Sequence, residues 1–218
     1  MTATTLIWDI EASDLKADWG RLLCVGYKWQ GAAKTTVRSI WEPALKGCNV
    51  IDDEPLLRAF WPILCSAKAH VTYFGSGYDL PFLQAKALRY RITEVPQGRH
   101  IDLYRYAKPH LLLRSRRLAN VMTFLRTKAA KSPVLGETWQ LAEAGDTKSA
   151  RYIIDHCRAD VVGLEETYHL MAPVVHRWGP CAACGSLLRV SNGIRPFKGR
   201  PSRRIWCQAC GVWERRVM

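Results

Sequence analysis

The chain opens with the segment LIWDIEA (residues 6–12), whose apolar and β-branched residues predict a buried strand over residues 5–12. Side chains alternate along a strand, so Asp9 and Glu11 point to one face while Trp8 and Ile10 point to the other. Two neighbouring carboxylates repel each other unless a cation lies between them. The segment therefore predicts half of a divalent-metal site, and a solvent-facing pair at a strand end is the alternative.

The following segments carry strand-like and helix-like patterns in turn. Two further strands with short connections predict an antiparallel meander with the first strand. Beyond them, strand and helix alternate, which predicts an α/β domain with a mixed sheet. The predicted strands are 5–12, 21–29, 34–41, 70–74 and 100–103, and the predicted helices are 52–66, 80–89, 114–127 and 148–171.

Two more acids lie where a site would form. Asp79 directly follows the strand 70–74, and α/β sheets place ligands at strand ends; an ordinary helix N-cap is the alternative. Asp160 lies on the apolar side of the last helix, and a buried carboxylate must be paired, hydrogen-bonded or metal-bound. A structural salt bridge is the alternative for Asp160. The apolar stripe that defines this side is Ile153, Cys157, Leu164 and Tyr168.

Three segments together resemble the exonuclease motifs of the DEDD superfamily, in order and spacing, over about residues 5–171. They are LIWDIEA (6–12), YFGSGYDLPFL (73–83) and HCRADVVGLEETY (156–168). The nearest resemblance is to bacterial and phage proteins regarded as RNase H-like exonucleases. It implies an RNase H-like fold, with a mixed five-stranded sheet flanked by helices.

The resemblance also implies 3′→5′ exonuclease chemistry on DNA or RNA with two Mg²⁺ or Mn²⁺ ions. Its metal ligands would be Asp9, Glu11, Asp79 and Asp160. Two such ions clamp the attacking and leaving oxygens of a phosphodiester, and carboxylates are the ligands that Mg²⁺ prefers.

His156 departs from the superfamily pattern, which has a Tyr four residues before the last Asp or a His five before it. Here His156 is four before Asp160, and Asp155 is five before it. An imidazole can orient or deprotonate water near neutral pH, so His156 is a fifth candidate catalytic residue. The alternative is a neutral helix histidine without a catalytic role.

The net charge of +13 favours a polyanionic partner, of which nucleic acid is the first candidate. A generally basic, soluble surface is the alternative. Residues 173–218 contain nine Lys and Arg and one acid, so they hold +8 of the +13. This shift predicts a boundary at Ala172–Pro173 and two domains, 1–172 and 173–218.

Two C-x-x-C pairs lie in the second predicted domain, at Cys181 and Cys184 and at Cys207 and Cys210. Two such turns complete a tetrahedron of thiolates, which predicts one structural zinc ion in a zinc ribbon. Disulfides do not suit a cytosolic protein, and a redox pair does not explain two symmetric motifs. The other four cysteines, predicted to be reduced and buried, are Cys24, Cys48, Cys65 and Cys157.

The ribbon is predicted to have strands at 186–190 and 203–206, with a basic insert at 195–204. Cations suit phosphates and aromatic rings suit stacked bases, so the insert predicts a nucleic-acid surface; a protein-docking ribbon is the alternative. Its candidate residues are Arg195, Lys198, Arg200, Arg203, Arg204, Phe197 and Trp206.

Arg114, Arg116 and Arg117 form a further basic group that is predicted to contact phosphates, with a solvated basic face as the alternative. Asp102 matches a position where the related branch has an acid, and we expect a structural role for it rather than a metal role.

The chain thus predicts a metal-dependent nuclease, most concretely a 3′→5′ exonuclease that binds a nucleic-acid 3′ end. A structure-selective endonuclease on the same fold and a non-catalytic nucleic-acid-binding protein are the alternatives. No apolar run approaches the roughly 20 residues that span a bilayer. No secretory signal is recognised at the start, so we expect a cytoplasmic protein of a bacterial cell or a phage-infected host.

Overall fold

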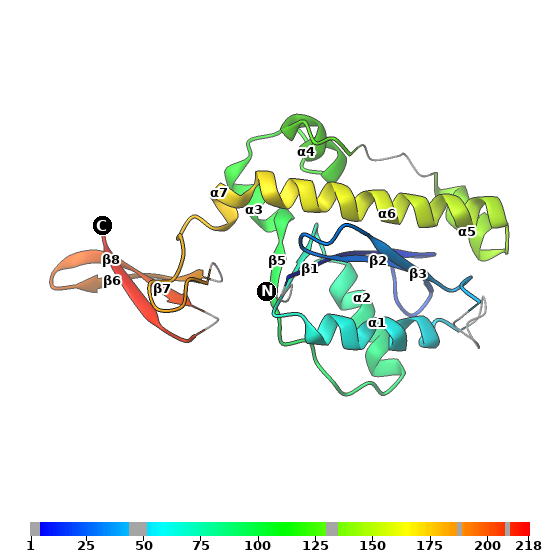
Figure 1. Cartoon of the computed structure of the whole chain (residues 1–218), viewed down its shortest axis with the longest axis horizontal. Coiled ribbons are helices and arrows are strands. Elements are labelled where there is room, and N and C mark those ends of the chain that lie inside the picture. Colours follow the sequence, from blue (N-terminus) through cyan, green and yellow to red (C-terminus); the bar gives the residue numbers. More distant parts are fainter. Residues whose placement is uncertain (1–4, 44–51, 130–134, 187–188, 208–209) are drawn as a thin grey trace. The chain divides into compact units, whose positions relative to one another are not determined.

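The computed structural model describes residues 5–43, 52–129, 135–186, 189–207 and 210–218 (Figure 1). The chain divides into two compact units, Met1–Leu170 and Met171–Met218, close to the predicted boundary at Ala172–Pro173. No helix in the described ranges is both long and apolar enough to cross a membrane.

The first unit contains a five-stranded sheet in the order β3-β2-β1-β4-β5. The strands β1, β2 and β3 pair antiparallel, whereas β4 and β5 continue from β1 in parallel pairing. The predicted meander and mixed sheet are therefore confirmed, and β1 lies at the centre of the sheet. The strands are β1 (Thr5–Ala12), β2 (Leu22–Trp29), β3 (Thr36–Ser39), β4 (Ala69–Thr72) and β5 (Arg99–Asp102).

Helices cover both faces of this sheet, with α1 and α2 on one side and α6 on the other (Figure 1). The helices are α1 (Glu54–Ser66), α2 (Asp79–Arg89), α3 (Leu103–His110), α4 (Leu118–Leu125), α5 (Gly136–Glu143) and α6 (Thr147–Leu170). The fold is thus the RNase H-like α/β architecture that the sequence predicts.

The two faces of β1 meet different environments, as the alternation of its side chains requires. Trp8 is buried in the core and packs against Phe60 of α1, with ring centroids 5.7 Å apart. Asp9 and Glu11 point to the opposite face, which α6 covers. On that face β2 and α6 approach so closely that a Cβ at Gly26 would lie 2.8 Å from Cys157 Sγ. Gly26 therefore sets the distance between helix and sheet.

A buried ionic network fixes the start of α1. Asp53 Oδ2 accepts a hydrogen bond from Leu22 N at 2.6 Å and pairs with Lys86 Nζ at 3.0 Å. The Tyr90 hydroxyl donates to the other oxygen of Asp53. Since Asp53 and Lys86 are almost fully buried, this pairing compensates the desolvation of both charges and ties β2, α1 and α2 together.

One predicted helix in the first unit has a wrong start, and two helices were not predicted. The helix predicted over residues 114–127 begins only at Leu118, since Arg117 has an extended backbone and Tyr73 Oη donates to the Arg116 carbonyl at 2.5 Å. The helices α3 and α5 have no counterpart among the predicted elements. Both have only eight residues, so neither shows enough turns for an apolar period to emerge.

The second unit consists of α7 (Ala172–Val175) and an antiparallel sheet in the order β6-β7-β8. Its strands are β6 (Arg189–Phe197), β7 (Arg200–Cys207) and β8 (Trp213–Val217). The predicted basic insert at 195–204 lies in the β6–β7 hairpin, whose strands extend beyond the predicted strands into the insert. Lys198 and Gly199 make the turn with φ of 49° and 74°, the left-handed geometry that tight hairpins require. The strand β8 was not predicted.

Candidate active site and cysteine cluster

The predicted acids converge on one pocket of about 760 Å³ in the first unit. Alternation along β1 delivers Asp9 and Glu11, the start of α2 delivers Asp79, and the inner face of α6 delivers His156 and Asp160. These five residues are separated by up to 151 positions in the sequence, from Asp9 to Asp160, and they line the same cavity.

Glu11, His156 and Asp160 form the tightest part of this pocket. His156 Nε2 lies 3.6 Å from Glu11 Oε1 and 3.6 Å from Asp160 Oδ2. One ligand atom from each residue lies within 4.8 Å of the others, and all three side chains are buried. Two carboxylates and an imidazole at these separations have the geometry to hold a cation.

Asp79 is the first residue of α2 and is buried. Tyr78 occupies the N-cap position and its side chain makes no capping bond, so the structure does not show the N-cap alternative for Asp79. Asp79 Oδ1 instead accepts a hydrogen bond from Ile10 N at 3.4 Å, which places the carboxylate against β1.

The pocket has a strongly negative electrostatic environment. Burial and the nearby charges of Asp79, Glu11 and Asp9 raise the pKa of the Tyr78 hydroxyl far above its ordinary value. Burial is the largest cause of this shift, and the negative neighbours add to it because they also disfavour the phenolate. Such a concentration of acids favours the binding of cations.

Trp139 of α5 is a site residue that the sequence did not reveal. Its Nε1 donates a hydrogen bond to Glu11 Oε2 at 3.0 Å, and the indole lines the acid pocket. An ion pair of 3.0 Å between Arg21 and Glu143 also ties α5 to the start of β2. The sequence shows Trp139 only as an indole donor in a short segment for which no helix or strand was predicted, so nothing local links it to Glu11.

Asp102 is not among the residues that line the acid pocket, and its hydrogen bonds give it the structural role that we expected from the sequence. Its carboxylate accepts hydrogen bonds from Phe74 N at 2.8 Å, Ser76 N at 3.1 Å and Tyr104 N at 3.0 Å, and from the Ser76 hydroxyl. These bonds fix the turn between β4 and Asp79, so Asp102 positions the acid of α2 without facing it.

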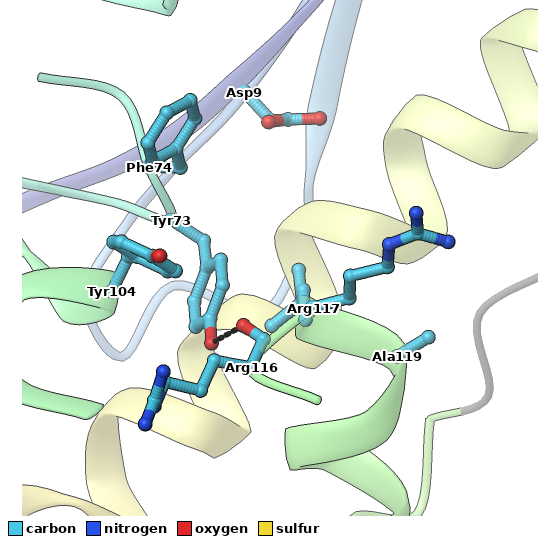
Figure 2. Close-up of a pocket in the computed structure, with 8 residues that line it drawn as sticks. Asp9, Tyr73, Phe74, Tyr104, Arg116, Arg117 and Ala119 are labelled. Atoms are coloured by element: carbon cyan, nitrogen blue, oxygen red, sulfur yellow. Dashed lines mark hydrogen bonds between the residues drawn. The ribbon is translucent and has the colours of Figure 1, made fainter. Parts of the chain in front are cut away.

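Two of the three arginines predicted to contact phosphates lie beside the site. Arg116 and Arg117 line a second cavity that also includes Asp9 (Figure 2). Arg114 is exposed and is not one of the residues that line this cavity.

Two buried thiols lie behind the acids. Cys157 Sγ is 3.8 Å from the carbonyl oxygen of Asp9. Burial raises the pKa of Cys24, and a hydrogen bond with Cys24 together with burial raises that of Cys157. Both thiols therefore stay protonated, in accord with the prediction of reduced, buried cysteines. Cys65 is half-buried, and Cys48 lies outside the described residues.

The four cysteines of the second unit form a compact cluster. Their sulfurs all lie within 4.8 Å of one another, with 3.8 Å between Cys181 and Cys210 and 3.6 Å between Cys184 and Cys207. A tetrahedral zinc ion with Zn–S bonds of about 2.3 Å separates its sulfurs by about 3.8 Å. The cluster is therefore compatible with zinc.

The two C-x-x-C turns have matching backbone geometry. Gly185 and Gly211, which follow them, have φ of 70° and 75°, and each donates its N–H to the carbonyl of the first cysteine of its turn. This left-handed position explains the glycine after each pair. Both turns consequently direct two sulfurs towards a common centre.

Aromatic rings of the second unit are covered by its own cations. Arg204 lies over Trp213 at 4.4 Å, Arg215 lies over Phe197 at 3.9 Å, and Trp206 stacks on Trp213 at 5.9 Å. Among the predicted nucleic-acid-binding residues, Arg195, Lys198 and Arg200 are exposed, Phe197 is just exposed, and Arg203, Arg204 and Trp206 are half-buried.

Arg189 is buried and has a structural role. In the sequence it is only one of the nine Lys and Arg residues of 173–218, and their charge gives no sign of this role. Its guanidinium donates to the carbonyls of Trp178 at 2.5 Å and Pro180 at 3.0 Å and pairs with Glu214. These bonds hold the segment that enters the first cysteine turn.

Comparisons with solved structures agree with this architecture. Brucella melitensis NrnC superposes with a TM-score of 0.54 and 15% identity, covering 81% of this chain and 75% of that one. Brucella melitensis NrnC bound to pGG gives the same TM-score and coverage with 17% identity. A structure described as the apo form of the nuclease gives 0.54 and 14%, covering 79% and 73%.

Sequence comparison adds a family but no individual relative. No curated protein matches the chain. A family profile, described as RNase_H superfamily, matches residues 6–172, which comprise the sheet, the helices around it and all the acids of the pocket. This chain therefore belongs to the RNase H superfamily.

Proposed function

We propose that this protein is a metal-dependent nuclease that hydrolyses phosphodiester bonds of DNA or RNA as a 3′→5′ exonuclease of the DEDD type. The observation that carries the proposal is the buried cluster of Glu11, His156 and Asp160, with Asp9 and Asp79 lining the same pocket. Burying so many acids together is costly unless cations neutralise them.

The donor set fits hard divalent cations. Asp9, Glu11, Asp79 and Asp160 offer carboxylate oxygens, which are the ligands that Mg²⁺ and Mn²⁺ accept most readily. In the proposed site these four residues hold two such ions. When bound, the ions supply positive charge for the phosphate oxygens and lower the pKa of a coordinated water.

The protein's own groups would orient this chemistry. His156 lies between two of the acids, where its imidazole would accept a proton from the attacking water. The indole of Trp139 holds one oxygen of Glu11 and leaves the other towards His156. The pocket therefore combines a proton acceptor with fixed carboxylates.

The proposed role of the second unit is to bind the substrate. One structural Zn²⁺ would be held by Cys181, Cys184, Cys207 and Cys210, whose sulfur separations fit a tetrahedron. Because Arg204 and Arg215 cover the faces of Trp213 and Phe197, we infer that this surface binds phosphates more than stacked bases.

The likeness to NrnC bound to pGG supports a nucleic-acid substrate, and binding of its 3′ end is part of the proposal. A protein partner of the ribbon and a cytoplasmic location in a bacterial cell or a phage-infected host remain predictions from the sequence.

The test is degradation of 5′-labelled single strands of DNA and RNA with Mg²⁺ or Mn²⁺. Shortening from the 3′ end is expected for the wild type, and loss of at least about 10³-fold in rate for Asp9→Asn and Asp160→Asn. The matched control is Asp155→Asn, which changes an acid on the same helix whose side chain is 62% exposed and pairs only locally with Arg158. This control should retain wild-type activity.

Two outcomes would contradict parts of the proposal. Cleavage of a circular single strand would show an endonuclease instead of an exonuclease. Salt-dependent binding without any metal-dependent cleavage would show a nucleic-acid-binding protein, and full activity in both Asn variants would exclude the assigned acids.

A further inference from the structure

The three-stranded sheet of the second unit has two faces of different charge (Figure 1). The register between β7 and β8 pairs Arg204 with Arg215 and pairs Arg203 with Arg216. Since neighbouring residues of a strand point to opposite faces, these two cross-strand pairs lie on opposite sides of the sheet. The four arginines therefore divide equally between the faces.

The face that carries Arg203 and Arg216 is covered and partly neutralised. Arg203 lies over the Trp178 ring at 5.3 Å, and Arg216 donates to the Trp178 carbonyl at 2.9 Å. Glu214 lies on the same face, where it pairs with Arg216 at 2.6 Å and with the buried Arg189. Because Glu214 is the only acid of the second unit, the opposite face has no acid at all.

That opposite face, which we call the arginine face, consists of three strands of exposed or half-buried cations. Arg195 belongs to it because it pairs with Ser202, which shares the face of Arg200 and Arg204. Within the described residues, no ion pair or side-chain hydrogen bond engages its guanidinium groups. The face thus presents four positive charges, from Arg195, Arg200, Arg204 and Arg215.

Aromatic rings hold two of these arginines in place. Arg204 lies over Trp213 at 4.4 Å, and Arg215 lies over Phe197 at 3.9 Å. Arg215 must cross β7 to reach that ring, and Ser202, which lies between them on the same face, is fully buried. Restricting the rotamers in advance reduces the conformational entropy that is lost when a guanidinium binds a ligand.

Stacking leaves the hydrogen-bonding capacity of both guanidinium groups available. A guanidinium contacts a ring through its flat face, whereas its five N–H donors lie in its plane. These donors can bind two oxygens of one phosphate. The rings are covered at the same time, so the face offers cations to a ligand instead of a flat apolar surface.

We propose that the arginine face binds successive phosphates of a single strand, and that the substrates are strands long enough to contact both units instead of dinucleotides. This inference rests on the proposed nuclease function. Residues on one face of a strand repeat at about 6.8 Å, so Arg200 and Arg204 lie about 14 Å apart along β7. A dinucleotide has too few phosphates to engage this face while its phosphodiester bond lies in the acid pocket.

The first test measures binding by fluorescence anisotropy over a series of salt concentrations, with Ca²⁺ in place of Mg²⁺. The ligand is a single strand of about 20 nucleotides, longer than the roughly 4–16 nucleotides of typical single-strand sites. Each phosphate contact that is lost reduces the slope of log K against log salt by about 0.7. Arg215→Gln should reduce the slope by this amount. Arg216→Gln removes the same charge from the opposite face and should keep the wild-type slope.

The second test measures how cleavage depends on strand length. With Mg²⁺ we expect the wild-type kcat/KM to be at least about 10-fold higher for the long strand than for a dinucleotide, since two linked contacts raise the apparent affinity. The double variant Arg204→Gln/Arg215→Gln should lose most of this length preference. Arg216→Gln should again serve as the control and keep it.

A further variant covers a failure of Arg215→Gln to fold. Arg200→Gln changes an exposed residue of the same face, so it should fold and reduce the salt slope equally. A wild-type slope in both folded variants would overturn the proposal, and so would an equal loss in Arg216→Gln. Stronger binding of polyglutamate than of the strand would show that an acidic protein occupies the face.

The two proposals can fail separately. If the wild type cleaves but neither the salt slope nor the length preference depends on the arginine face, the nuclease function stands and this inference falls. If the wild type binds strands through these arginines but cleaves none of them, the arginine face stands as a binding site and the nuclease function falls.

Discussion

Trp139 shows how one donor can set the geometry of a carboxylate. Its indole N–H is bonded to one oxygen of Glu11, and the other oxygen lies 3.6 Å from His156. The indole has no acceptor capacity, so it fixes the carboxylate without competing for a cation. The two oxygens of Glu11 thereby acquire different tasks.

Replacing Trp139 with Phe keeps most of the ring but removes the donor. We expect the Mn²⁺ affinity or the cleavage rate to fall by about 10- to 100-fold, since the partners of metal-binding side chains have effects of this size. Titration of cleavage with Mn²⁺ measures the change. Trp19→Phe, at a residue that is 82% exposed, serves as the control, and an equal loss there would reject the assignment.

His70 is buried in the first unit and should make the free energy of unfolding depend on pH. Its Nδ1 accepts a hydrogen bond from Trp8 Nε1 at 3.3 Å, and its ring stacks on His100 at 4.5 Å. Burial, together with the neighbouring His100, lowers the pKa of His70 to about 3. The native state therefore keeps this imidazole neutral at every pH above that value.

Below about pH 6.5 the unfolded chain binds a proton at this residue while the native chain does not. The free energy of unfolding should therefore fall by up to ~1.4 kcal/mol per pH unit as pH decreases from 6.5 towards 3. Urea unfolding at pH 7 and pH 5 measures this slope. His70→Gln should give a shallower slope, and an identical slope in wild type and variant would show that other groups cause it.

The contact between β2 and α6 depends on the absence of a side chain at Gly26. A Cβ there would lie 2.8 Å from Cys157 Sγ and 3.1 Å from the Cys157 carbonyl oxygen. The second of these atoms is backbone, so relief requires α6 to shift. Because α6 carries His156 and Asp160, that shift would also disturb the acid pocket.

Gly26→Ala should accordingly destabilise the first unit by about 1–3 kcal/mol, the usual cost of overpacking. Chemical denaturation monitored by circular dichroism measures it. Gly136→Ala is the matched control, since no atom lies within 4 Å of a Cβ there and its backbone is helical. Equal stability of the two variants would contradict the packing argument.

The long strand β1 and the long helix α6 were predictable from the sequence, and so were the directions of their acids, because side-chain periodicity along one element determines both. Alternation along β1 places Asp9 and Glu11 on one face, and the apolar stripe of α6 places Asp160 inward. The family profile and the sheet order confirm the predicted fold. Asp79 depended on a motif, because nothing local distinguishes it from a capping residue.

The rest of the site depends on contacts between distant segments, which carry no local pattern. Trp139 meets Glu11 across 128 positions and Tyr73 meets Arg116 across 43. Arg189 was counted with the surface charge, although three backbone carbonyls and Glu214 enclose it. Short helices such as α5 have too few turns to show a period.

At the scale of the whole molecule, the two units have different sources of stability. The first unit buries a large apolar core on both faces of its sheet. Among its described residues the second unit has only three strands and few buried apolar side chains, so we expect the proposed zinc ion to supply much of its folding free energy.

Removal of zinc with a chelator should therefore unfold residues 171–218 while residues 1–170 stay folded. Hydrogen exchange of the full chain measures this, with faster exchange expected only in the second unit. Cys207→Ser should reproduce the effect, whereas Cys65→Ser, at a half-buried cysteine outside the cluster, should not. Unchanged exchange in the second unit after chelation would exclude a structural role of the metal.

The position of β1 at the centre of the sheet has a consequence for the order of folding. This strand pairs with β4, which lies some 64 residues later, and Asp9 meets Cys157 of α6 across 148 positions. Contacts at such separation form slowly, because a long loop must close before they contribute. A growing polypeptide therefore lacks a complete set of these acids until α6 has been synthesised, so the acid pocket cannot form before that helix.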